Sequence, residues 1–369
     1  MKCYVCDIEI TSELETDEHI LLNAAGGRLK SKNLICKNCN SQFGEKIDSE
    51  LAKQLNNLSN MLMVKRHRGE PQPIIGDNTA SGEKYKLEVG GTPKMTKPIV
   101  DKKVDGDKTH ISVTARSESE LRNILKGIAK KNPKFDIEEA MKSAQRKTEY
   151  LDDPLHFQNV IGGKDVFRAI CKCATNFYVL KQKESSQIRH LLPYIKGETD
   201  KDIVWMHYQD DIYELEAHES SHIIHLVGNS KDKTLYCYVD YFNTYKYLVL
   251  LNEDYNGKDI KETYCFDLVN ICEQDKIVNI DYDRETLLDF FTNKDAKPFN
   301  KVKKSFDHSI ALGLKRQDDF QRNELLERAI QDSLGKHPDG VPITEEMINE
   351  TIQEIMKNIT PYLLRRMKK

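Results

Sequence analysis

The chain has 369 residues, of which 38% are hydrophobic and 31% are charged, and its formal net charge is −3. This length exceeds one ordinary core and predicts two or three domains in a soluble globular protein. The small net charge excludes a general polycation, so any contact with nucleic acid must be local. The sequence has no apolar run long enough to span a membrane and no signal-peptide pattern. We therefore expect a cytoplasmic location and no membrane partner.

Two pairs of cysteines stand close together near the start of the chain, Cys3 with Cys6 and Cys36 with Cys39. Two CxxC pairs in a short segment are the usual signature of a tetrahedral four-thiolate zinc site. Because four thiolates leave no position for water, the zinc is expected to be structural. It would stabilise a segment that is too short to bury much surface by itself. The other five cysteines lie among apolar residues, which predicts buried free thiols.

Apolar residues recur at three- and four-residue spacing from Phe43 to Leu58, which predicts a helix directly after the second cysteine pair. A Pro- and Gly-rich stretch from 69 to 82 then predicts a linker or turn segment. Alternating residues at 85–89 and 110–113 predict short strands. Ser117, followed three residues later by a glutamate, has the pattern of a helix start.

The second half of the chain predicts a change from helix to strand and back. The apolar positions of residues 165–180 fit a helical period, whereas residues 203–268 contain three strand-like runs with turn residues between them. From about Asn300 the pattern is helical again, and one helix is expected to begin near Thr344. These elements together indicate an α+β fold.

The first segment, residues 1–58, resembles the HNH endonuclease family, and in particular its four-cysteine zinc subgroup. The order of motifs carries this resemblance. They are Cys3–Cys6, Glu18-His19-Ile20, Gly26-Gly27, Cys36-Lys37-Asn38-Cys39-Asn40, Phe43-Gly44 and Ile47-Asp48. The resemblance implies a ββα-metal nuclease domain, with residues 1–68 as its extent. Leu22 departs from the pattern, since many members have a proline there.

The resemblance also implies roles for individual residues. His19 matches the general base that activates water, and Glu18 matches a ligand of the catalytic divalent ion. Asn40 matches the second protein ligand, while Asn33 matches the asparagine that fixes the loop carrying the base. Asp48 follows two turns after Asn40 on the same predicted helix. It could support the metal site, or it could be a solvated carboxylate.

The chemistry of these side chains agrees with those roles. An imidazole titrates near about pH 6.5 and can take a proton from water near neutral pH. Carboxylate and amide oxygens suit magnesium or manganese, which would leave positions for phosphate oxygens and water. DNA contact requires phosphate neutralisation. The predicted contacts are the basic residues around the second cysteine pair, Arg28, Lys30, Lys32 and Lys37. A solvated basic face is the alternative.

A second motif has the letters of a zinc-protease site, His218-Glu219-Ser220-Ser221-His222. That motif works on a helix, where both histidines share one face. Here it runs directly into a strand-like stretch, so we expect no protease site.

The sequence thus predicts a metal-dependent HNH endonuclease that hydrolyses DNA, with a structural zinc and a catalytic magnesium or manganese. An α+β accessory region is expected over 83–300, for specificity, sensing or partner binding, with a C-terminal helical segment over 301–369. The resemblance suggests restriction or phage (antiviral) defence, and a homodimer or a protein partner from a defence system stays open. The alternative function is a non-catalytic zinc-finger module that binds nucleic acid on a regulatory protein. Such a module would not need Glu18, His19 and Asn40.

Overall fold

In the computed structural model, Met1–Pro71 and Val160–Lys369 form one compact unit, and Gln72–Asn159 form a second. The structure describes residues 1–106, 108–133, 135–145, 151, 153–293, 299–338 and 340–367. This division differs from the domain boundaries expected at residues 68, 82 and 300. Only the break after residue 71 falls inside the predicted linker. The reason is that the apolar residues of the first segment share one core with residues far along the chain.

The first segment folds as two short strands followed by a helix. Strand β1 (Glu18–His19) pairs antiparallel with β2 (Lys30–Ser31), and the 3-10 turn η1 (Asn23–Ala25) lies between them. The turn is tight at Gly27, where a Cβ atom would lie 2.0 Å from the carbonyl oxygen of Leu21. Only glycine fits there.

The helix predicted over residues 43–58 is present, but it is built from three continuous parts. Helix α1 (Lys37–Phe43) passes through the π-helical turn η2 (Gly44–Asp48) into α2 (Ser49–Met61). The apolar face of this helix is buried, as the spacing predicted, with Leu51 and Leu55 fully buried. A π-helical turn inside a longer helix is uncommon and is frequently found at functional sites. Here it ends on Asp48.

A six-stranded antiparallel sheet forms the centre of the first unit, in the order β14-β13-β10-β11-β12-β9. Its strands are β9 (Val204–Met206), β10 (Ser221–Asn229), β11 (Thr234–Tyr241), β12 (Tyr245–Asn252), β13 (Ile260–Asp267) and β14 (Cys272–Gln274). Successive residues of β11 alternate between two apolar clusters, with Cys237 in one and Tyr238 in the other. The sheet is therefore covered on both faces, which explains why its strands read as nearly continuous apolar runs.

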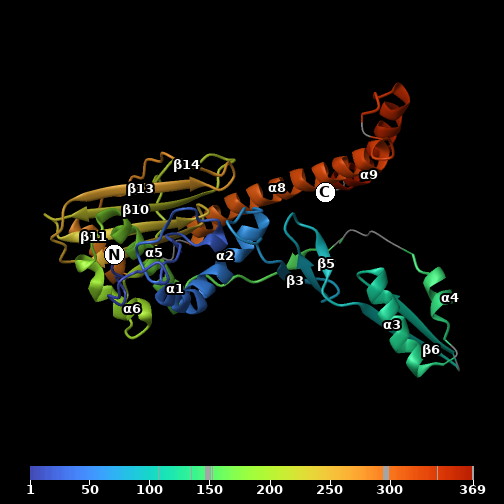
Figure 1. Cartoon of the computed structure of the whole chain (residues 1–369), viewed down its shortest axis with the longest axis horizontal. Coiled ribbons are helices and arrows are strands. Elements are labelled where there is room, and N and C mark those ends of the chain that lie inside the picture. The colour runs from blue at the N-terminus through green and yellow to red at the C-terminus, as the bar shows by residue number, and fades with distance from the viewer. Residues whose placement is uncertain are drawn as a thin grey trace. The chain divides into compact units, whose positions relative to one another are not determined.

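Helix α5 (Lys164–Gln182) packs against one face of this sheet and also against α2 and η2 (Figure 1). It therefore lies between the sheet and the N-terminal segment. Nearly every residue from Val166 to Val179 is buried, including Lys172 and Asn176. Sequence periodicity predicted this helix correctly, but it assigned burial only to its apolar positions.

Further helices complete the first unit. They are η3 (Ser186–Leu191), α6 (Leu192–Lys196), α7 (Arg284–Thr292), α8 (Phe299–Leu334) and α9 (Glu345–Met367). Helices α8 and α9 pack against each other, and α8 also contacts α2, where the Gln317 amide donates to the carbonyl oxygen of Met61. The helix expected to begin near Thr344 is α9. None of the helices in the described ranges has the length and apolarity that crossing a membrane requires.

The described residues of the second unit form two small antiparallel sheets and two helices. One sheet has the order β5-β4-β3-β8, and β6 pairs with β7 in the other. The elements are β3 (Ile74–Asn78), β4 (Lys84–Leu87), β5 (Pro93–Met95), β6 (Ile99–Asp105), β7 (Lys108–Thr114), α3 (Glu118–Lys131), α4 (Ile137–Lys142) and β8 (Leu155–His156). Ser117 caps α3 as its sequence predicted, because its side chain accepts from the backbone N–H of Glu120. Strand β3 occupies part of the stretch predicted as linker.

Candidate active site

The four cysteines of the two CxxC pairs come together in the folded chain. The sulfur atoms of Cys3, Cys6, Cys36 and Cys39 all lie within 4.8 Å of one another, and those of Cys6 and Cys36 are 3.7 Å apart. A tetrahedron with Zn–S bonds of about 2.3 Å has edges of about 3.8 Å. The cluster is therefore compact enough for a four-thiolate zinc ion, and it can hold zinc as a structural ion.

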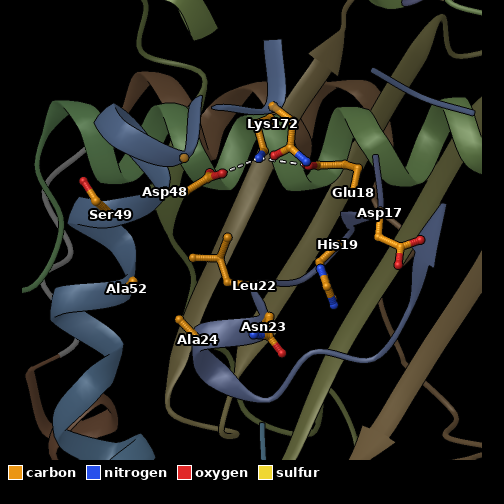
Figure 2. A pocket seen from close by; sticks show the side chains of 12 residues that line it. Asp17, Glu18, His19, Leu22, Asn23, Ala24, Asp48, Ser49, Ala52 and Lys172 are labelled. Atoms are coloured by element: carbon orange, nitrogen blue, oxygen red, sulfur yellow. Dashed lines mark hydrogen bonds and ion pairs between the residues drawn. The ribbon is translucent and has the colours of Figure 1, made fainter. Parts of the chain in front are cut away.

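A pocket of about 260 Å³ is lined by residues of β1, η1, the continuous helix α1–η2–α2 and α5. Figure 2 shows it from close by. Its lining residues are Asp17, Glu18, His19, Leu22, Asn23, Ala24, Asn40, Gly44, Asp48, Ser49, Ala52 and Lys172. Three residues predicted for catalysis, Glu18, His19 and Asn40, thus line one hollow. The fourth, Asn33, does not line it.

His19 lies at the end of β1 and is partly buried. The pKa of His19 is lowered to about 4, first by burial and then by the nearby cationic side chains of Lys30 and His67. The ring of His67 lies 6.3 Å from that of His19. The imidazole is therefore neutral at pH 7 and has a lone pair that can accept a proton.

Glu18 is 2% exposed and is fixed by two residues of α5. The Lys172 ammonium lies 2.8 Å from Glu18 Oε1, and the Asn176 amide donates to the same oxygen over 2.7 Å. Asn176 in turn accepts from the hydroxyl of Tyr4 over 2.6 Å. Lys172 and Asn176 are four residues apart on α5, so both side chains reach the site from one face of the helix.

Lys172 also contacts Asp48, the last residue of η2. Its ammonium lies 2.5 Å from Asp48 Oδ2, and Figure 2 shows it between Asp48 and Glu18. Burial raises the pKa of Glu18, and the charge of Lys172 opposes that rise. Burial alone would lower the pKa of Lys172, but the charges of Asp48 and Glu18 raise it above the ordinary value. The three groups therefore form a buried ion cluster inside the candidate site.

Asn40 and Asn33 have different surroundings. The Asn40 amide nitrogen donates to the hydroxyl of Thr16 over 2.9 Å. This hydrogen bond fixes the orientation of the Asn40 side chain, which lines the pocket. Asn33 is exposed, and its backbone N–H donates to the Ser31 hydroxyl over 3.2 Å. Its place in the β2 loop is compatible with shaping that loop, but it does not reach the hollow.

The four basic side chains predicted to contact DNA differ in whether they already have a partner within the protein. Lys30 pairs with Asp17 over 2.7 Å, and Lys32 pairs with Glu15. Arg28 donates to the carbonyl oxygen of Lys65. Lys37 is exposed at the start of α1. Two of the four charges are thus already balanced by carboxylates of the loop before β1.

The protease-like motif lies where its sequence context predicted, at the start of strand β10 and not on a helix. His222 is fully buried, one ring nitrogen lies 2.7 Å from the carbonyl oxygen of Ala25, and the other accepts from the backbone N–H of Phe242. Glu219 is buried and pairs with Lys276. Both ring nitrogens of His222 are therefore used within the fold.

The other cysteines follow the prediction in four cases. Cys171, Cys173, Cys237 and Cys265 are buried free thiols. Cys272 is exposed, because it lies on the short edge strand β14.

Two short antiparallel strands, a following helix, a four-cysteine cluster that can hold zinc and a Glu-His step beside an asparagine together have the arrangement of a ββα-metal nuclease domain. In agreement, residues 3–56 match the family model described as HNH endonuclease. This part of the chain is thus similar to HNH endonucleases. The match ends before α5, so it includes neither Lys172 nor Asn176. Comparison with curated proteins and with solved structures gave no match.

Sequence reasoning missed Lys172 and Asn176, although a signal was present. Between Val166 and Leu180 the charged residues are only Arg168 and Lys172. A lysine in such an apolar helix needs a buried counter-charge. That requirement could have pointed to a carboxylate elsewhere, but not to which one.

Proposed function

We propose that this protein is a metal-dependent endonuclease that hydrolyses phosphodiester bonds in DNA. The observation that carries the proposal is the pocket, where Glu18, His19 and Asn40 line one hollow of about 260 Å³. These side chains come from β1 and from α1, and the family match covers both elements.

In this proposal His19 is the general base and accepts a proton from the attacking water. Its low pKa keeps the ring neutral before substrate binds. A phosphodiester bound beside it would raise that pKa, because a negative charge stabilises the imidazolium. The ring would then hold the proton more strongly as the reaction proceeds.

Glu18 and Asn40 would hold the divalent ion, through carboxylate and amide oxygens that suit magnesium or manganese. Such an ion neutralises charge on the phosphate and on the leaving oxygen. Lys37 would contribute to DNA contact with Arg28, Lys30 and Lys32, although Lys30 and Lys32 must first leave their carboxylate partners. We therefore expect weak binding that depends steeply on salt.

A plasmid-nicking assay with magnesium or manganese tests the proposal. His19→Ala should reduce nicking on the order of 10²-fold or more, because a general base typically contributes that much. Zinc content and DNA binding should stay unchanged. His110→Ala is the matched control, because this exposed histidine lies on β7 in the second compact unit and does not line the pocket. Equal nicking by the wild type and His19→Ala would place the activity elsewhere.

The biological setting forms a separate part of the proposal. The resemblance of the first segment supports a role in restriction or phage defence, with DNA as substrate and a homodimer or a protein partner. Expression of the wild type and of His19→Ala in a phage-challenged host tests this role. Equal plaque numbers in both strains would contradict it. RNA offered in the nicking assay tests the choice of DNA.

A further inference from the structure

The charges of the pocket raise a difficulty for a divalent ion held by Glu18 and Asn40 alone. Asn40 is neutral, and the buried ammonium of Lys172 cancels the charge of Glu18. Lys172 is itself only 1% exposed, so solvent does not screen this pair effectively. A divalent cation would then meet a site with no net negative charge. A second carboxylate is required to attract it.

Asp48 supplies that carboxylate, and one of its oxygens is unused. Its side chain is 14% exposed and lines the same pocket, and Oδ2 is occupied by Lys172. Oδ1 is buried and has no hydrogen-bond partner among the described residues. A buried, unpaired carboxylate oxygen is costly unless something binds it. Oδ1 is therefore a candidate metal ligand.

The same pattern recurs at the other two ligands. Both contacts of Glu18 with α5 fall on Oε1, and Asn40 donates through its amide nitrogen to Thr16. Glu18, Asn40 and Asp48 are thus each fixed through one polar atom of the side chain. The second polar atom is an oxygen in every case. All three side chains line the same pocket, so each offers it one carboxylate or amide oxygen.

We propose that Asp48 is a third protein ligand of the catalytic divalent ion, and that Lys172 and Asn176 of α5 are positioning residues for it. This inference rests on the proposed function. It makes α5, which lies outside the matched segment, a necessary part of the nuclease centre. Lys172 holds the two carboxylates at a fixed separation, and Asn176 prevents Glu18 from turning. Such outer partners normally orient metal ligands and adjust their affinity.

Manganese binding to the full-length, zinc-loaded protein tests this without any reaction. Free Mn²⁺ gives an electron paramagnetic resonance signal that disappears on binding, so titration yields an affinity. Asp48→Asn should weaken Mn²⁺ binding by about 10–100-fold, the range found when the shell of a metal site is disturbed. The substitution is nearly isosteric and leaves Lys172 paired with Glu18, so the fold should persist. Glu45→Gln removes an equal charge from the exposed side of η2 and should change affinity less than about twofold.

Two substitutions that keep the local charge test the positioning role. Asn176→Leu removes a donor to Glu18, and Lys172→Arg keeps the positive charge but alters its geometry. Both should weaken Mn²⁺ binding about 10-fold while zinc content and the circular dichroism spectrum stay as in the wild type. Asn132→Leu, at an exposed end of α3, is the control for Asn176→Leu. If Lys172→Arg does not fold, the affinity of Asn176→Leu for Mn²⁺ alone tests the positioning role.

The outcomes separate the inference from the function on which it rests. Wild-type affinity in Asp48→Asn, together with lost binding in Glu18→Gln, would reject Asp48 as a ligand and leave the proposed function standing. Wild-type affinity in Asn176→Leu and Lys172→Arg would reject the positioning role. No tight Mn²⁺ site in the wild type, or one that Glu18→Gln does not affect, would contradict the metal-dependent function itself.

Discussion

The four-cysteine cluster and the candidate active-site pocket differ in where their residues come from. The four thiols lie between residues 3 and 39, and the match to the HNH endonuclease family includes them all. The pocket begins with Glu18, His19 and Asn40 in that segment, but Lys172 comes from a helix 124 positions beyond Asp48. The residues of the cysteine cluster are thus local in sequence, whereas the charges of the candidate site come partly from the rest of the chain.

The largest effect should follow from removing one thiol of the four-cysteine cluster. Cys36→Ser should abolish tight zinc binding, because three thiolates no longer close the tetrahedron. The free energy of zinc binding in small domains is about 10–16 kcal/mol, so the first segment should unfold. Native mass spectrometry would measure the zinc, and proteolysis would measure the unfolding. Cys272→Ser, on the exposed edge strand, is the control and should keep both. A folded, metal-free first segment in Cys36→Ser would contradict the four-thiolate assignment.

A fragment of residues 1–71 should separate the two regions directly. It contains all four thiols and should bind zinc. It lacks Lys172 and Asn176, and the apolar face around Leu51 that packs in the common core would be exposed. We therefore expect bound zinc, no tight Mn²⁺ site and no nicking. Zinc analysis, Mn²⁺ titration and the plasmid assay would test this. Full nicking by the fragment would mean that α5 is not required.

What could be predicted from the sequence follows the same division. The cysteine pairs, the Glu-His step and the helix after them are encoded by spacing within one short segment, so their arrangement was predictable. Helix periodicity also gave α5 and its apolar face. Periodicity cannot show what a buried polar residue contacts, and so Lys172 remained without a role. The domain boundaries differed for a related reason, since the shared core joins residues such as Ile20 and Phe177 that no local pattern connects.

A third prediction concerns the contact between the β1–β2 loop and strand β10. His222 is fully buried, and one of its ring nitrogens lies 2.7 Å from the carbonyl oxygen of Ala25 in η1. Burial lowers the pKa of His222 to about 4. In the unfolded chain a histidine titrates near about pH 6.5. On acidification the unfolded state therefore binds the proton first. Stability should fall as the pH drops below about 6.5 and level off near pH 4.

The size of this effect is about 3 kcal/mol at pH 4, from a shift of roughly 2.5 units at about 1.36 kcal/mol each. Urea unfolding between pH 7 and pH 4 would measure it. His222→Gln cannot titrate but retains a polar side chain. Its unfolding free energy should therefore depend less steeply on pH, because unfolding would take up as much as one proton fewer. The same slope in both proteins would show that His222 does not carry the acid sensitivity.

The smallest effect is expected from the hydrogen bond that joins the first cysteine pair to helix α5. The hydroxyl of Tyr4, between the first two zinc thiols, donates to Asn176 Oδ1 over 2.6 Å, and Asn176 then donates to Glu18. Tyr4→Phe keeps the packing of the ring but leaves the buried Asn176 oxygen without its donor. Such a loss costs about 1–3 kcal/mol. The expected result is a lower midpoint of urea unfolding with unchanged zinc content.

Because Asn176 keeps its bond to Glu18, Mn²⁺ binding in Tyr4→Phe should weaken less than in Asn176→Leu. Tyr85→Phe, in the second compact unit, is the control for the loss of a tyrosine hydroxyl near an exposed surface. Equal stability of Tyr4→Phe and the wild type would show that the hydrogen bond from Tyr4 to Asn176 contributes nothing measurable. The cysteine cluster and the candidate pocket would then be connected only through the backbone that they share.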